Sequence, residues 1–588
     1  MVRTTRAVGI IVLGIVVLTV AAASALFLGR RGSQPDPGRP AVSPASALVR
    51  GGELTASLRS EPSTYNRYVE ASAPAEVLAM LTQAPLLRVN RTTDQLEPWL
   101  AESWTQSADG LTYTLKLRQG VTFSDGTPFT SADVLFSYRA LYDPRANTVI
   151  AGDVLVAGKP LVVEAPDPAT VVLRFAGPFA AGLRLVDSVP ILPRHKLEAA
   201  LLAGKFAEAW GAATPPADLA GLGPFVLAEH VSGERLVFVR NPHFWRKDAA
   251  GTQLPYLDKL TVRILPDQNA EALRMQTGEI DLMSNADIRP DDYATFKRIA
   301  AGGRLRLIDG GTSLDPNLLW FNLGRAGAAD PRSRWLRRKE FRLALSCAVD
   351  RQSIINTVYL GAGVPIYEPI TPANRTWYSP AQPACVHDSA RARALFASAG
   401  LTDRNGDGML EDASGTPARF SIITQRGHTL RERTVAVLQE QLRQAGIAVD
   451  VVALDTKSIV QRWTAGDYDS IFYGVQASST DPALSPHFWL SSGNFHFWNP
   501  RQAVPSTGWE GRMDGLFREQ AVTAGLPERQ RLVTEMQRLF VEELPGIYFV
   551  APAVTIAVSD RVANPSPVPQ IPQLLWSADT LAVAAPRR

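Results

Sequence analysis

The chain has 588 residues, of which 46% are hydrophobic and 20% charged, an ordinary globular composition with room for several hydrophobic cores. Four arginines, Arg3, Arg6, Arg30 and Arg31, lie in the first 31 residues, and the remaining 56 bases nearly balance the 57 acids. This balance, with no clustered basic stripe, argues against a nucleic-acid partner.

The first 31 residues are predicted to direct export. Residues 7–28 are 22 consecutive positions without a charge, which at about 1.5 Å per residue can cross a hydrocarbon core of about 30 Å. Ala23-Ser24-Ala25 is an A-x-A-like cleavage site, but Leu26-Phe27-Leu28 continues the apolar run. An uncleaved membrane anchor and a cleaved signal peptide both remain open, and both place Gly51 onward outside the cytoplasm. Residues 32–48 form a linker rich in Pro, Gly and Ser.

Hydrophobic patterns predict both strands and helices in the folded part. Tyr113, Leu115 and Leu117 alternate with polar residues, as in an antiparallel strand with one buried face. Thr130 and Asp133 form a capping-box pattern that predicts a helix start. The other predicted elements are strands at Gly51–Leu58, Leu236–Val239 and Leu260–Ile264, helices at Phe341–Val349 and Arg351–Leu360 with Asp350 as a cap between them, and a helix at Glu528–Leu544.

The two cysteines do not make a disulfide framework in a chain of this length. Cys347 lies in a predicted helix, where we expect it to be a small core residue. A bridge between Cys347 and Cys385 is compatible with the sequence but is not required by it.

Strand and helix patterns alternate between Phe420 and Val475. The pattern predicts strands at Phe420–Thr424, Ile447–Leu454 and Ser470–Val475, and helices at Leu430–Ala445, with Gly446 as its stop, and Lys457–Thr464. This alternation is typical of a parallel, doubly wound sheet, which binds ligands beyond the carboxyl ends of its strands. That end is Gln476–Asp481 here, followed by a loop crowded with aromatic residues.

The sequence carries no motif for hydrolytic chemistry. It contains neither HExxH nor GxSxG, so we expect no enzymatic activity and no cofactor. Asp403–Gly408 resembles the start of a calcium-binding loop, but the twelfth position, which needs a bidentate acid, is Ser414, and Glu411 stands at the ninth. A hydrophilic turn is therefore expected, and no metal site is predicted.

Several blocks of the chain together resemble one family. The blocks are Leu100–Leu141, Gly221–Trp245, Gly278–Leu282, Trp320–Leu360, and Ala445–Ile447 with Gly466–Asp469. They resemble the extracytoplasmic solute-binding proteins of ABC importers, family 5, which includes oligopeptide, dipeptide and nickel binders. The resemblance extends roughly from residue 50 to residue 560.

The resemblance implies an α/β, periplasmic binding protein-like (type II) fold, with two lobes of mixed doubly wound sheets and an inserted small domain. Hinge closure would then enclose a ligand between the two lobes. The implied division is lobe I at 49–90, 213–315 and 546–588, domain II at 91–212, and lobe III at 316–545.

The chain departs from the family pattern after the strand Ser470–Val475. Peptide binders of this family typically carry an Asp there that pairs with the ammonium of the peptide, and the corresponding position here is Ser478. A buried ammonium needs a charged partner, so a free-amine peptide is a doubtful ligand unless Asp481 takes this role.

The ligand-binding residues are predicted partly from the sheet argument and partly from the resemblance. Each has a structural alternative: core packing for the aromatic residues, loop capping for the polar ones. The candidates are Tyr65, Asn66, Trp320, Asn322, Gln476, Ser478, Asp481, Trp489, Phe495 and Trp498.

The resemblance implies a monomeric binding component of an ABC importer, which captures a peptide or similar medium-sized solute and delivers it to membrane permease subunits. The alternative is a membrane-tethered solute sensor or surface interaction protein with the same fold. An extracytoplasmic enzyme would need acid and base groups clustered in the cleft.

Overall fold

The computed structural model describes residues 48–585, except 325–329, 331, 381, 382, 384, 475, 476, 478, 479 and 501; it also leaves out the side chains of 48, 49 and 284–287. The predicted export segment and most of the linker therefore lie outside the described residues. In the part of the chain that is described, no helix is both long enough and apolar enough to span a membrane.

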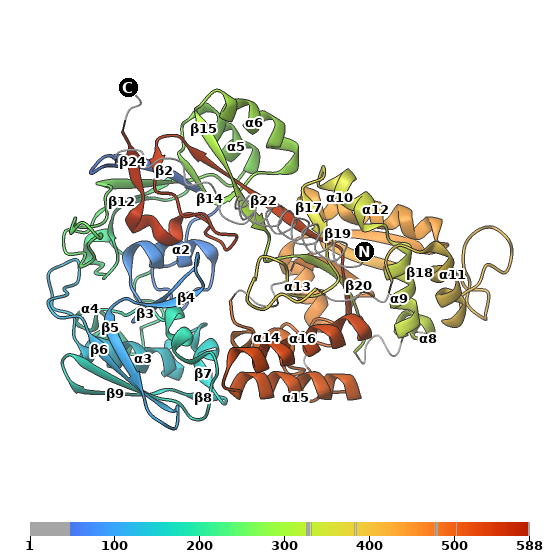
Figure 1. Ribbon diagram of the computed structural model, residues 1–588, viewed down its shortest axis with the longest axis horizontal. Helices are drawn as coiled ribbons and strands as arrows, with labels where there is room; N and C mark the ends of the chain where they lie inside the picture. The colour runs from blue at the N-terminus through green and yellow to red at the C-terminus, as the bar shows by residue number, and fades with distance from the viewer. Residues whose placement is uncertain are drawn as a thin grey trace, which may run out of the picture. The chain divides into compact units, whose positions relative to one another are not determined.

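An eight-stranded mixed sheet gathers segments that lie far apart in the sequence. Figure 1 shows blue β2, green β14 and red β22 side by side. The pairings of β2 with β13 and β14 are parallel, and those of β22 with β14 and β15 are antiparallel. Its strands are β11 (Phe225–Val231), β12 (Arg235–Arg240), β13 (Lys259–Ile264), β2 (Glu53–Leu58), β14 (Leu282–Asp287), β22 (Val550–Ser559), β15 (Leu305–Thr312) and, paired with β22, β17 (Gly363–Pro365).

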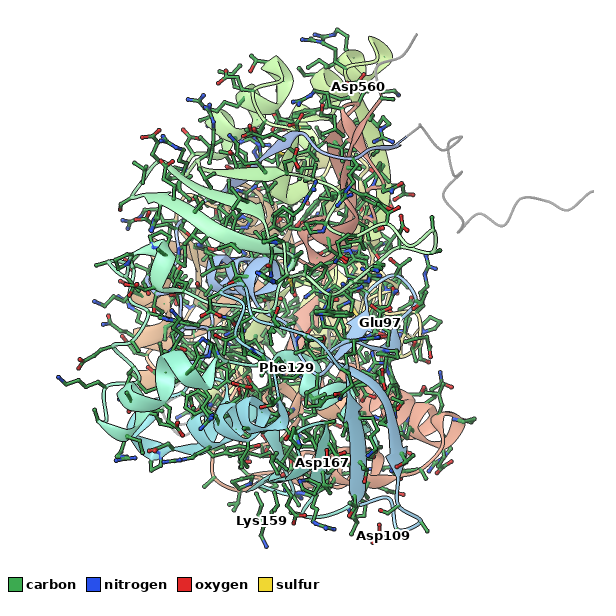
Figure 2. The ribbon with its side chains drawn as sticks, turned by 90° about the vertical axis from the view of Figure 1, so that its left-hand side faces the viewer. Glu97, Asp109, Phe129, Lys159, Asp167 and Asp560 are labelled. Carbon is green, nitrogen blue, oxygen red and sulfur yellow. A yellow bond between two sulfur atoms is a disulfide. The ribbon has the colours of Figure 1, made fainter. Side chains whose placement is uncertain are left out.

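A four-stranded antiparallel sheet follows early in the chain, with its hairpin turns at opposite ends. Figure 2 labels Asp109, in the turn between β5 and β6, and Asp167, at the end of β9. The capping box at Thr130 and Asp133 forms as predicted and begins the helix α3 (Ser131–Tyr142). The sheet contains β5 (Ala101–Gln106), β6 (Thr112–Leu117), β10 (Thr170–Arg174) and β9 (Val162–Asp167).

A five-stranded sheet confirms the alternation predicted between Phe420 and Val475, although Val475 itself is not described. β18 (Arg419–Gln425) lies between β19 (Ala448–Leu454) and β20 (Ser470–Gly474), and pairs in parallel with both. The helix α12 (Thr429–Gln444) ends before Gly446, whose φ of +87° favours glycine. The sheet continues with β16 (Asn317–Phe321), antiparallel to β20, and then β21 (Gly546–Tyr548).

The chain passes from the eight-stranded to the five-stranded sheet at residues 313–316, adds β17 beside β22 of the eight-stranded sheet between α10 (Arg351–Val358) and α11 (Ser389–Ser398), and returns at Phe549. β21 (residues 546–548) pairs with β16 in the five-stranded sheet, and the predicted division into lobes stays a prediction.

The remaining helices cover the sheets or connect their strands. Asp350 caps α10 by accepting a hydrogen bond from the amide of Ser353, as predicted. Cys347 is buried in α9 and forms a disulfide with Cys385. These helices are α2 (Ala73–Thr82), α4 (Arg194–Leu202), α5 (Gln268–Thr277), α6 (Tyr293–Ala301), α8 (Ser333–Leu336), α9 (Lys339–Ala348), α10 (Arg351–Val358), α11 (Ser389–Ser398), α13 (Thr456–Ala465), α14 (Pro486–Trp489), α15 (Gly508–Val522) and α16 (Leu526–Glu543).

Short strands and short 3₁₀ helices complete the described chain. They are β1 (Leu48–Val49), β3 (Leu87–Asn90), β4 (Gln95–Pro98), β7 (Leu155–Val156), β8 (Lys159–Pro160), β23 (Val562–Ala563) and β24 (Ala582–Ala584), with the 3₁₀ helices η1 (Pro144–Ala146), η2 (Ala151–Val154), η3 (Gly182–Ser188), η4 (Pro216–Asp218), η5 (Pro290–Asp292), η6 (Pro482–Leu484) and η7 (Leu575–Thr580).

Candidate ligand-binding site

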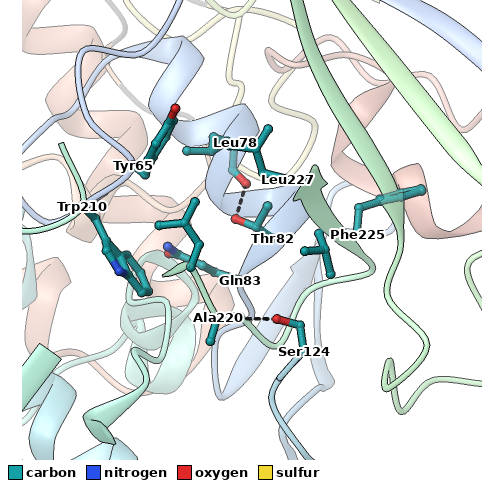
Figure 3. Close-up of a pocket in the computed structure, with 12 residues that line it drawn as sticks. Tyr65, Leu78, Thr82, Gln83, Ser124, Trp210, Ala220, Phe225 and Leu227 are labelled. Carbon is teal, nitrogen blue, oxygen red and sulfur yellow. Dashed lines mark hydrogen bonds between the residues drawn. The ribbon is translucent and has the colours of Figure 1, made fainter. Parts of the chain in front are cut away.

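The side chains of Tyr65 and Asn66 are buried, and their polar groups bind neighbouring protein groups. The hydroxyl of Tyr65 lies 3.1 Å from the carbonyl of Ala212 and 2.5 Å from Nδ1 of His230. The amide of Asn66 donates to the carbonyl of Phe206 and accepts from the backbone of Tyr68. The cavity beside Tyr65, shown in Figure 3, measures about 20 Å³, which is room for one water and not for a solute.

Trp320 lies in β16, and Asn322 comes directly after the end of this strand. The ring of Trp320 is buried, with its centroid 4.6 Å from that of Phe497. The amide of Asn322 donates to the carbonyls of Gly466 and Tyr468. Since β16 runs antiparallel to β20, Asn322 lies at the edge of the sheet opposite to the carboxyl end of β20.

Asp481 is engaged by a buried arginine. Its two carboxylate oxygens accept hydrogen bonds from Nη1 and Nη2 of Arg529 at 2.9 and 2.5 Å, and both side chains are nearly fully buried. The carboxylate also accepts from the amide of Ala483 and so caps η6. A buried carboxylate that is paired with an arginine gives no support to the alternative in which Asp481 binds the amine of a peptide.

Two of the three aromatic candidates that follow β20 lie inside the protein. Trp489 donates from Nε1 to the carbonyl of Ala477, and Trp498 donates to Glu510; each side chain is 2% exposed. Phe495 is 47% exposed and stacks on Phe497, with ring centroids 5.7 Å apart. Gln476 and Ser478 lie outside the described residues, so their predicted contact with a ligand stays a prediction.

Four elements meet around one arginine at the carboxyl edge of the five-stranded sheet. Arg431, in the first turn of α12, donates from Nε to Oδ1 of Asn317 at 2.8 Å and from Nη1 to Oε1 of Gln425. Its guanidinium carbon lies 3.9 Å from the centroid of the Tyr473 ring. Asn317 begins β16, Gln425 ends β18, and Tyr473 is next to last in β20, so strand register brings these residues together.

Gly474 makes room for this arrangement. A Cβ atom at Gly474 would come within 2.7 Å of Nη2 of Arg431 and within 3.0 Å of Oδ1 of Asn317. Any larger residue would push the guanidinium away from the strand end.

The eight-stranded sheet approaches the same edge. Arg433 of α12 forms an ion pair of 2.7 Å with Asp291, in η5 after β14. Arg59, directly after β2, pairs with Glu271 and is close enough to affect His428 electrostatically. Burial, together with the charges of Arg431 and Arg59, lowers the pKa of His428 to about 4, so this residue is neutral at physiological pH.

Arg431 and Tyr473 were not predicted from the sequence. Both lie at the carboxyl ends of the strands, where a doubly wound sheet binds ligands. The predicted sheet therefore indicates the first turn of α12 as well as the loop after β20. The sequence prediction relied on the aromatic residues after β20, and most of these side chains pack into the core.

The predicted hydrophilic turn contains three close carboxylates. One oxygen from each of Asp403, Asp407 and Glu411 lies within 4.8 Å of the others. Asp403 accepts hydrogen bonds from Gly406 and Gly408 of the loop itself.

Residues 95–497 match the family model described as "Bacterial extracellular solute-binding proteins, family 5 Middle". A Deinococcus radiodurans protein named "Probable ABC transporter-binding protein" is 27% identical over 542 residues, which is 88% of this chain and 89% of the relative. The oligopeptide-binding protein AppA of Bacillus subtilis is 27% identical over 486 residues, 79% of this chain and 81% of the relative.

Solved structures agree with this match in fold. AppA in complex with a nonapeptide has a TM-score of 0.71 and 22% identity, with 92% of this chain and 100% of that chain covered. The periplasmic binding protein MelB of Agrobacterium fabrum, in complex with stachyose, has a TM-score of 0.72 and 21% identity, with 92% and 86% covered. The matched region is more than half of the sequence, and the chain belongs to the bacterial extracellular solute-binding proteins of family 5.

Proposed function

We propose that this protein is the substrate-binding component of an ABC importer and holds its solute at the carboxyl edge of the five-stranded sheet. The observation that carries this proposal is the meeting of Arg431, Asn317, Gln425 and Tyr473 at that edge, with Arg59 and Asp291 approaching from the eight-stranded sheet. Ligands of open α/β sheets bind at such strand ends.

Capture occurs by closure of the two sheets on each other. Residues 313–316 and Phe549 are the connections that would act as hinges, because short segments between rigid elements absorb such rotations. The ion pair between Arg433 and Asp291 joins the two sides and would open with the hinge. The lobe boundaries given above are part of this proposal.

The protein acts outside the cytoplasm, as a monomer, and passes its solute to permease subunits in the membrane. Residues 7–28 export the chain, either as a signal peptide or as a retained anchor. Its role is binding without catalysis. The ligand is a peptide or another medium-sized solute: the relatives and structural neighbours support both, since AppA is an oligopeptide-binding protein and the MelB structure holds stachyose.

Native mass spectrometry of the full chain, followed by thermal unfolding, tests this proposal. We expect a co-purified small molecule, or a rise in melting temperature with at least one member of a panel of oligopeptides and oligosaccharides, because a ligand that binds only the folded state stabilises it. A protein that carries no solute and whose melting temperature responds to no member of the panel would contradict it.

A further inference from the structure

We propose that Arg431 binds an anionic group of the solute, a carboxylate or another small oxyanion. This inference rests on the proposed function and specifies the chemistry of its ligand. The guanidinium is half-buried at the strand edge, and its planar donors fit oxyanions.

The partners of Arg431 are all neutral. Two amide oxygens, from Asn317 and Gln425, and the ring of Tyr473 hold the guanidinium. No carboxylate of the described residues lies within ion-pair distance of it. Neutral groups therefore orient the partly buried positive charge, and it forms no ion pair with a described carboxylate.

Other buried arginines of this protein are satisfied differently. Arg342 and Arg351 direct Nε, Nη1 and Nη2 to backbone and hydroxyl oxygens, and Arg529 directs its nitrogens to Asp481 and Gln520. In Arg431, Nε and Nη1 are held by the amides, while Nη2 lies over Gly474 at the strand end.

The surroundings of Arg431 favour a negative charge. The N-terminus of α12, a helix of 16 residues, carries a positive partial charge at this point. The carboxylates nearby have other partners: Asp291 pairs with Arg433, Glu271 with Arg59, and Glu432 accepts from the amide of Gly427. Asp315 interacts electrostatically with Arg431 but forms no ion pair with it, and burial raises the pKa of its carboxyl group.

A purely structural role for Arg431 makes a different prediction. If the residue only tied α12 to β16 and β18, its replacement would lower stability and would weaken acidic and neutral solutes alike. If it binds an oxyanion, its replacement removes the preference for acids. Selectivity between acid and amide, rather than stability, separates the two roles.

The test uses the full chain and matched pairs of probes: tetraalanine and its C-terminal amide, galacturonate and galactose, succinate and succinamide. Calorimetry measures the affinity of each probe for the wild type, Arg431→Gln, Arg431→Lys and Arg443→Gln. The control residue Arg443 lies at the far end of the same helix, exposed and paired with Glu440.

We expect the acid of a bound pair to bind the wild type more tightly than its neutral partner. Arg431→Gln should weaken the acid about ten- to hundredfold, as for a lost charged hydrogen bond, and leave the neutral partner unchanged. Arg431→Lys should keep part of the preference, and Arg443→Gln all of it.

The inference would be overturned if the wild type bound the acid and its neutral partner equally, or if Arg431→Gln kept the preference for the acid. Either result would leave the proposed role in solute binding intact. The absence of binding by every probe, in a protein that also carries no co-purified solute, would reject the inference and the proposed function together. A co-purified neutral solute would overturn the inference alone.

Discussion

Asp481 has the negative charge that an ammonium ligand needs, but Arg529 already binds its carboxylate. The fork with Arg529 occupies both of its oxygens, and the guanidinium of Arg529 in turn lies 4.6 Å from the ring centroid of Trp377. Asp481→Asn leaves Arg529 buried without its counter-ion. We expect the free energy of unfolding, measured with urea, to fall by about 3 kcal/mol, the range for breaking a buried ion pair.

The matched control for this change is Glu528→Gln, in an exposed pair with Arg531 on α16, which should leave the stability unchanged. If Asp481→Asn kept full stability but abolished the binding of free-amine peptides, Asp481 would be a ligand-binding residue after all.

At the scale of one element, Glu510 links helix α15 to the aromatic loop before it by hydrogen bonds. In the capping box of α15 it accepts from Thr507, and it also accepts from His496 and Trp498. Burial alone would raise its pKa, but hydrogen bonds from His496, Gln502 and Ser506 hold the pKa of Glu510 well below its ordinary 4.5. Glu510 therefore stabilises the folded state fully at pH values above the ordinary pKa of the unfolded chain, and loses this effect as pH falls towards its folded pKa.

The measurement is the difference in melting temperature between the wild type and Glu510→Gln across pH. We expect a constant difference in favour of the wild type down to about pH 5, and a shrinking difference below about pH 4. The exposed Glu519, on the same helix, provides the control variant Glu519→Gln. A difference for Glu510→Gln that grew as pH fell would contradict the assignment.

The disulfide joins α9 to the segment before α11 across a sequence separation of 38. Closing a loop of this length in the unfolded chain accounts for up to about 4 kcal/mol of stability in the chain-entropy treatment. Reduction of the wild type should therefore lower its melting temperature in calorimetry, and a Cys347→Ala, Cys385→Ala double variant should not respond to the reductant. A fully reduced wild type with an unchanged melting temperature would show that the bridge does not stabilise the fold.

Strands and helices with a clear hydrophobic period could be predicted from the sequence, whereas most side-chain contacts of the candidate ligand-binding site could not. The strands and helices between residues 419 and 474 follow from apolar spacing and from glycine stops such as Gly446. Spacing cannot tell whether a loop tryptophan faces a ligand or the core: the indole of Trp489 turns inward to the carbonyl of Ala477. Arg431 looks like a surface charge in sequence, because its partner Asn317 lies 114 residues away and only strand register brings them together.

At the scale of the whole molecule, both cysteines are in the disulfide, and the described residues include no free cysteine. Thiol-reactive fluorophores would therefore label only introduced cysteines. Val239 in β12 of the eight-stranded sheet and Val451 in β19 of the five-stranded sheet are exposed positions for such a pair. The distance between the labels reports how the two sheets move.

Single-molecule energy transfer between labels at Val239→Cys and Val451→Cys tests the central claim most directly. With saturating amounts of the matched-pair probe that most raises the melting temperature, we predict a narrower distribution of transfer efficiencies, shifted away from that of the solute-free protein. A probe that binds by calorimetry but leaves the distribution unchanged would contradict capture by closure of the two sheets.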